Sequence, residues 1–208
     1  MKRMAIASLM VFLLLCSFGC HTKPAEDFFT GEGLLSLEEI EKYVSLFEKD
    51  LTVFKEETGL SDDDITKHER YPGLYHTSVN RTFSEQTFAL QLLTDATVNP
   101  ETLWGYQYFL TFEETDDPKA FEIAADIAVK ARDLYGEPDT YPIAPGRIFT
   151  EDGELIEGGS NEVWEVMENI EFQINVHSAY EQGGAAIELR YRIRNPRLSR
   201  NSDYPKNS

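Results

Sequence analysis

The clearest pattern in the chain is an alternation of side chains between Trp104 and Phe112. Large apolar residues occupy every second position, namely Trp104, Tyr106, Tyr108, Leu110 and Phe112. The positions between them hold Gly105, Gln107, Phe109 and Thr111. Because side chains on a strand alternate between two faces, this pattern predicts a strand with one large apolar face that another layer must cover.

A helix is predicted from Asp117 to Tyr135. Asp117 suits the N-cap and Pro118 suits the first helical position, where a missing backbone N–H has no effect. Gly136 and Pro138 are typical of a helix end. Apolar residues, many of them alanine, recur with helical spacing along one side of this segment. We therefore expect the helix to pack closely on the aromatic strand.

A second long helix is predicted between Ser36 and Gly59. Ser36 and Glu39 have the spacing of a capping box, and Gly59 suits the helix end. Apolar residues between Leu37 and Phe54 cover one wide face of this helix. We expect this face to lie on the same sheet.

Other strands are predicted at residues 87–93, 163–166, 170–177 and 185–193. The first should pair antiparallel with the strand that begins at Trp104, because Asn99-Pro100 separates the two. Residues 60–82 are predicted to be irregular, with one short turn that Ser61 and Asp64 cap. Residues 148–155 have the pattern of a small hairpin.

The last two strands form the clearest pair in the sequence. Both alternate apolar with polar side chains, and matching their apolar faces places Phe172 opposite Leu189 or Tyr191. Either register places Glu171 opposite Arg190 or Arg192, which is a favourable pair of opposite charges.

These elements together predict an α+β fold. We expect two layers, with a mainly antiparallel sheet and two long helices on one of its faces. Residues 34–196 are expected to form a single domain, and residues 197–208 a flexible polar tail.

Residues 1–20 have the composition of a targeting segment. Lys2 and Arg3 precede an apolar run from Met4 to Leu15, and the segment ends in Ser17-Phe18-Gly19-Cys20. It resembles a bacterial lipoprotein signal peptide, in which a peptidase cuts before a diacylated cysteine. The resemblance implies a membrane anchor on Cys20 and a location in the cell envelope, outside the cytoplasm. Ordinary signal cleavage and an uncleaved membrane anchor are the alternatives. Residues 21–33 are predicted to be a polar tether.

Composition limits the partners of the chain. The 208 residues carry 37 acidic and 19 basic side chains, for a formal net charge of −18. Nucleic acid is therefore not an expected partner, because binding it requires a basic surface. The two cysteines, Cys16 and Cys20, both lie in the targeting segment, so the folded part has no disulfide and no cysteine nucleophile.

Two groups of residues are candidates for binding. Arg190, Arg192 and Arg194 share one face of a predicted strand and suit an acidic partner, or else pair with acids on neighbouring strands. Phe109 is on the polar side of its strand and Trp164 follows a glycine-rich loop. Exposed aromatic residues of this kind are typical of a binding surface, although a second small core is the alternative.

The acidic runs and the four histidines have no spacing typical of a metal site, and we predict no metal, cofactor or catalytic residue. The sequence favours a lipid-anchored binding module for a protein, a peptide or a glycan. A carboxylate-dependent glycan hydrolase and an inhibitor or immunity-type protein are the alternatives.

Overall fold

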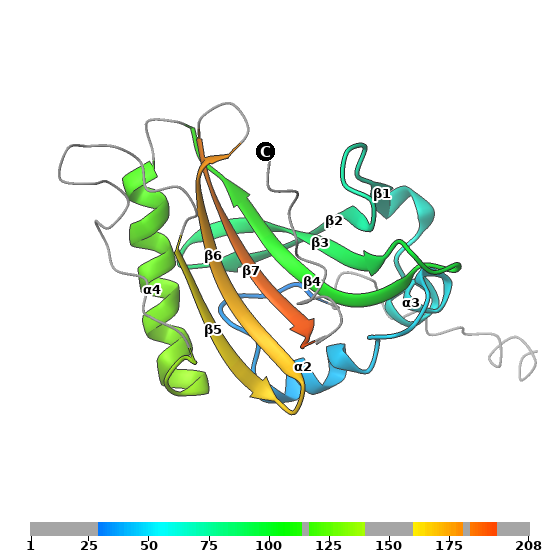
Figure 1. The fold of residues 1–208 in the computed structure, drawn as a ribbon, viewed down its shortest axis with the longest axis horizontal. Coiled ribbons are helices and arrows are strands. Elements are labelled where there is room, and N and C mark those ends of the chain that lie inside the picture. Colours follow the sequence, from blue (N-terminus) through cyan, green and yellow to red (C-terminus); the bar gives the residue numbers. More distant parts are fainter. Residues whose placement is uncertain (1–28, 114–116, 140–159, 181–183, 195–208) are drawn as a thin grey trace, which may run out of the picture.

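The computed structural model describes residues 29–113, 117–139, 160–180 and 184–194. Its elements follow one another as shown in Figure 1. They are α2 (Leu37–Val44), α3 (Leu51–Thr58), the short 3-10 helix η2 (Asp62–Asp64), β1 (Ile65–Lys67), β2 (Leu74–Phe83), β3 (Gln86–Asp95), β4 (Thr102–Thr111), α4 (Asp117–Tyr135), β5 (Ser160–Met167), β6 (Ile170–Tyr180) and β7 (Gly184–Ile193).

The strands form one twisted antiparallel sheet in the order β1-β2-β3-β4-β7-β6-β5. The predicted aromatic strand is β4, and it lies at the centre of the sheet between β3 and β7. The helix α4 runs beside β5 and β6 (Figure 1). The predicted α+β class with an antiparallel sheet is confirmed.

Several local predictions are confirmed at the residue level. The helix α4 ends at Tyr135, and Gly136 has a φ of 88°, in the left-handed region. Strands β3 and β4 pair antiparallel. In the pair of β6 and β7, Phe172 lies opposite Tyr191 and Glu171 lies opposite Arg192, which is one of the two predicted registers.

The predicted long helix between Ser36 and Gly59 is wrong, because two short helices stand in its place. The capping box of Ser36 and Glu39 starts α2 as predicted. Asp50 then starts α3, since its carboxylate accepts hydrogen bonds from the N–H groups of Thr52 and Val53. Between the helices, Glu48 and Lys49 exchange backbone hydrogen bonds with Leu103 at 2.7 and 2.8 Å. Pairing with the beginning of β4 therefore replaces the central turn of the predicted helix.

The predicted boundary between tether and domain also differs from the structure. Phe29 is fully buried, and its ring lies 4.3 Å from that of Tyr43. The buried guanidinium of Arg81 donates hydrogen bonds to the carbonyl oxygens of Thr30 and Gly33 at 2.7 and 2.8 Å. The folded domain thus includes residues 29–33, which the sequence analysis places in the tether. The predictions for residues 1–20, 148–155 and 197–208 lie outside the described residues.

Residues 60–82 are more regular than predicted. Ser61 and Asp64 form the expected capped turn, which is η2. The ten-residue strand β2 was not predicted, because its side chains alternate weakly. Its pairing with β3 is irregular between His76 and Asn80, which explains the interrupted pattern.

One face of the sheet carries the aromatic core. Tyr106, Tyr108, Phe172 and Tyr191 are fully buried on this face. Both helical regions contribute to the core, since Tyr43 of α2 contacts Tyr106, and the ring of Tyr135 of α4 lies against Phe172. Within the described residues, no helix combines the length and apolar character needed to cross a membrane.

A bulge in β4 changes the predicted faces of this strand. Leu93 lies opposite Gly105 and Thr94 lies opposite Leu103, so Trp104 is an extra residue in β4. Tyr106 and Tyr108 face the core as predicted, but Trp104 lies on the other face together with Gln107 and Phe109. The predicted position of Trp104 on the core face is wrong, because one inserted residue reverses the alternation.

Candidate functional site

The second face of the sheet contains polar side chains that are nevertheless buried. At least nine-tenths of the surface of each is covered. They are Gln91 of β3, Gln107 of β4, Glu171, Gln173 and Asn175 of β6, and Glu188 of β7. Polar groups are buried in proteins when they are hydrogen-bonded, so this face must contain an internal network.

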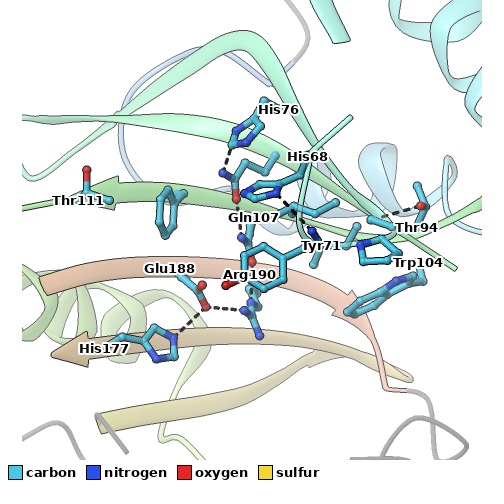
Figure 2. A pocket seen from close by; sticks show the side chains of 16 residues that line it. His68, Tyr71, His76, Thr94, Trp104, Gln107, Thr111, His177, Glu188 and Arg190 are labelled. Atoms are coloured by element: carbon cyan, nitrogen blue, oxygen red, sulfur yellow. Dashed lines mark hydrogen bonds and ion pairs between the residues drawn. The ribbon is translucent and has the colours of Figure 1, made fainter. Parts of the chain in front are cut away.

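Part of that network is a row of hydrogen bonds across five strands, which we call the polar ladder. The ladder consists of His76, Gln91, Gln107, Arg190, Glu188 and His177 (Figure 2). The strand register explains it, because His76 lies opposite Gln91, Gln91 opposite Gln107, and Gln107 opposite Arg190. Residues far apart in the sequence thus form one row.

Arg190 determines the direction of the hydrogen bonds in the ladder. Its Nε can only donate, and it donates to Gln107 Oε1 at 2.6 Å. The Gln107 amide therefore donates to Gln91 Oε1, also at 2.6 Å. Gln91 Nε2 then faces His76 Nδ1 at 3.1 Å, so His76 must accept this bond. The row is complete when His76 is neutral, with its proton on Nε2.

The other end of the ladder is an ion-paired carboxylate. Glu188 lies 2.5 Å from the guanidinium of Arg190 and 3.1 Å from Nε2 of His177. Burial alone would raise the pKa of Glu188. The hydrogen bond from His177 and the charges of Arg190 and His177 outweigh this effect and lower the pKa below its ordinary value of 4.5. Glu188 therefore remains ionised at neutral pH.

A hollow of about 530 Å³ lies over the ladder. Gln91, Gln107 and Glu188 form its polar floor, and the rings of Tyr71, Trp104 and Phe109 line it as well (Figure 2). The floor amides are only 3% exposed, whereas Tyr71 is 46% exposed at the rim. A concave site with aromatic walls and a few placed polar groups is typical of ligand binding.

The loop that carries Tyr71 is held in place on the hollow. Nδ1 of His68 accepts hydrogen bonds from the backbone N–H groups of Arg70 and Tyr71 at 3.1 and 3.3 Å. The ring of His68 also lies 4.8 Å from that of Tyr71 and 5.0 Å from that of His76. Thr94 of β3 donates a backbone hydrogen bond to Gly73. The loop is therefore attached to both β2 and β3.

The structure places the binding candidates predicted from the sequence in three different environments. Arg190 and Phe109 line the hollow. Arg192 and Arg194 each form an ion pair with Glu171 at 3.1 Å. This agrees with the alternative that these arginines pair with acids on a neighbouring strand. Trp164 is buried in the core on the opposite face.

The anchor candidate Cys20 lies outside the described residues. The sequence analysis missed several residues that line the hollow, which are His68, Tyr71, His76, Gln91, Trp104 and Gln107. The sequence pattern could have identified two of them, because Gln91 and Gln107 each interrupt a run of large apolar residues within a strand.

Gly105 makes room beside the hollow for Arg192. The guanidinium of Arg192 lies 6.0 Å from the centre of the Trp104 ring, within range of a cation–π contact. A Cβ atom at position 105 would lie 2.8 Å from the Tyr191 carbonyl oxygen and 2.9 Å from the Cβ of Arg192. The close approach of β4 to β7 at this point therefore requires glycine.

Gly105→Ala is expected to lower the free energy of unfolding by about 1–3 kcal/mol, because the backbone of β7 must move to accept the methyl group. Urea unfolding measures this loss, and the fluorescence of Trp104 should change with it. Wild-type stability in the variant would contradict the close packing described for these strands.

The ladder also predicts a pH dependence of stability. Burial, with a smaller contribution from the charge of His68, lowers the pKa of His76 below the ordinary value of 6.5. The unfolded chain therefore binds this proton more readily than the folded chain. The contribution of His76 to stability is present above pH 6.5 and is lost as the pH falls below that value.

His76→Gln provides the matched variant, since a glutamine oxygen accepts the bond from Gln91 at any pH. Between about pH 7.5 and 5.5, we expect the wild type to lose more stability in urea unfolding than His76→Gln. An equal loss in both proteins would show that His76 is not the titrating group.

Within the described ranges, no group of three or more histidine, cysteine, aspartate or glutamate side chains is arranged to hold a metal ion. Models of protein families, the sequences of curated proteins and solved structures were compared with the chain, and none of them matches it.

Proposed function

We propose that the protein is a lipid-anchored binding module of the bacterial cell envelope, and that its ligand occupies the hollow over β3, β4 and β7. The observation that carries this proposal is the hydrogen-bonded polar floor beneath aromatic side chains. Hydrogen bonds between neighbouring floor residues hold their side chains in place, so a ligand does not have to order these side chains on binding.

The state of Glu188 favours binding over hydrolysis at this site. A carboxylate-dependent glycan hydrolase needs a carboxylic acid whose pKa is raised, so that it can protonate the leaving group. The pKa of Glu188 is instead lowered by its partners His177 and Arg190, although burial opposes this. Its carboxylate is ionised and paired with Arg190, which suits a fixed part of a binding site.

The location in the envelope is supported by the sequence of residues 1–20. The basic start, the apolar run and the final Cys20 suit export followed by acylation of the cysteine. Mass spectrometry of the mature N-terminus tests this part of the proposal. The expected result is a chain that begins at a lipid-modified Cys20, and an unmodified Cys20 would contradict the anchor.

Site-specific photocrosslinking in intact bacterial cells tests the binding function. Thr111 lines the hollow and is exposed, so a photoreactive amino acid at this position should capture whatever occupies it. The same amino acid at Glu122, an exposed position of α4, is the matched control. We expect an adduct from position 111 that is weak or absent from position 122.

A second variant makes this result specific. Tyr71→Ala removes an exposed ring from the rim of the hollow, and we expect it to reduce the adduct at position 111. Leu134→Ala removes an exposed apolar side chain of α4 and should leave the adduct unchanged. Equal adducts from positions 111 and 122, or an adduct that Tyr71→Ala does not affect, would contradict the proposal.

A further inference from the structure

The floor of the hollow has hydrogen-bonding capacity that the ladder does not use. A glutamine side chain offers two N–H donors and two acceptor lone pairs. Within the ladder, Gln91 and Gln107 each donate one hydrogen bond and accept one. The ladder therefore leaves one donor and one acceptor of each amide unused. Their strands are neighbours, so these pairs repeat at about 4.8 Å across the sheet.

This repeated pair of donor and acceptor favours hydroxyl groups. A carboxylate only accepts hydrogen bonds and an ammonium group only donates them, whereas a hydroxyl does both. The charges in the hollow support the same conclusion. Among the described residues that line it, the one carboxylate, Glu188, and the one guanidinium, Arg190, pair with each other at 2.5 Å. A charged ligand would have to compete with this pair.

The position of the hollow argues against an extended peptide. Peptides that bind through their main chain usually add a strand at the edge of a sheet. The hollow lies over the face formed by β3, β4 and β7, which are all inner strands. The rings of Tyr71, Trp104 and Phe109 instead offer apolar surfaces that can cover the C–H faces of sugar rings.

We infer that the ligand of the hollow is an uncharged glycan, whose hydroxyl groups bond to Gln91 and Gln107 while its rings pack on Tyr71 and Trp104. The inference rests on the proposed function and gives the chemical class of the ligand. It assigns the floor amides, which lie on the face of the sheet beneath the hollow, as the groups that select the ligand.

The two tryptophans allow a direct test by ¹⁹F NMR. Trp104 lines the hollow, and Trp164 is buried on the opposite face. The full chain is labelled with 5-fluorotryptophan and purified in a zwitterionic detergent that contains no sugar. The Trp104 signal is assigned by its loss in Trp104→Phe. The probes are maltotetraose, cellotetraose and the tetramer of N-acetylglucosamine, with tetragalacturonate, the glucosamine tetramer and tetra-alanine as charged and peptide comparisons.

We expect at least one neutral tetrasaccharide to shift the Trp104 signal saturably and to leave the Trp164 signal in place. Tyr71→Ala should weaken this binding roughly five- to tenfold, which corresponds to the loss of about one ring contact. Leu134→Ala is the folded control and should bind like the wild type.

The possible failures are distinguishable. If tetragalacturonate, the glucosamine tetramer or tetra-alanine shifts Trp104 and the neutral sugars do not, the inferred ligand class is wrong while the binding function stands. If no probe shifts Trp104, or if Tyr71→Ala binds as tightly as the wild type, the glycan inference is overturned. The crosslinking experiment then decides the binding function independently, because it does not depend on the class of ligand.

Discussion

Phe172→Ala is expected to lower the free energy of unfolding by about 3–5 kcal/mol. Phe172 of β6 is fully buried on the aromatic face. Its ring lies 4.7 Å from Tyr191, 5.4 Å from Tyr135 and 5.5 Å from Trp164. Removing the ring would leave a cavity between α4 and three strands. Urea unfolding followed by circular dichroism measures the loss.

Phe109→Ala is the matched control, because it deletes the same side chain from the other face of the sheet. Phe109 is only partly buried. We expect its loss to be well below that of Phe172, since water can reach much of the space it leaves. Equal destabilisation by the two substitutions would mean that the aromatic face is not the main core.

Arg132→Met is expected to destabilise the domain by about 3–5 kcal/mol. Arg132 of α4 forms an ion pair with Glu162 of β5, and the carboxylate of Glu162 is fully buried on the core face. Methionine preserves much of the apolar stem but leaves the buried carboxylate without this cation. Thermal and urea unfolding of the purified chain measure the effect.

The partner substitutions make this prediction specific. Glu162→Gln removes the buried charge and should destabilise less than Arg132→Met, because the partly exposed head of Arg132 can turn to water. The double substitution Arg132→Met/Glu162→Leu should recover much of the loss. Equal destabilisation by Glu162→Gln and Arg132→Met would contradict the expectation that a buried carboxylate without its cation costs more than an arginine without its carboxylate.

The parts of the fold that the sequence predicted well depend on neighbours along the chain. The strand β4, the end of α4 at Gly136 and the register of β6 with β7 follow from alternation and capping signals. The break between α2 and α3 depends instead on pairing between Lys49 and Leu103, which are far apart in sequence. An apolar periodicity that continues through the break gives no sign of this contact.

The candidate site was less predictable than the fold for the same physical reason. Its floor exists only when His76, Gln91, Gln107 and Arg190 meet in register across four strands. A shift of one residue in any of these pairs would turn a ladder residue to the core. Trp104 reaches the hollow only because of the bulge in β4. Phe109 is recognisable because an aromatic residue interrupts the polar side of its strand, and Arg190 because it shares one strand face with two further arginines.

The two faces of the sheet have different roles in this interpretation. The face with Tyr106, Tyr191 and Phe172 packs against the helices and supplies stability. The opposite face carries the ladder, in which the polar side chains form hydrogen bonds with one another. A rigid sheet with one face committed to the core can present such polar groups in fixed positions.

The central claim is that a ligand contacts the amides of Gln91 and Gln107. The side-chain NH₂ signals of these residues in ¹⁵N-labelled protein, assigned with Gln91→Met and Gln107→Met, test it most directly. Addition of the neutral tetrasaccharide that shifts Trp104 should move both pairs of signals and leave the NH₂ signals of Asn80 unchanged. Saturable binding with the Gln91 and Gln107 signals unmoved would contradict the claim.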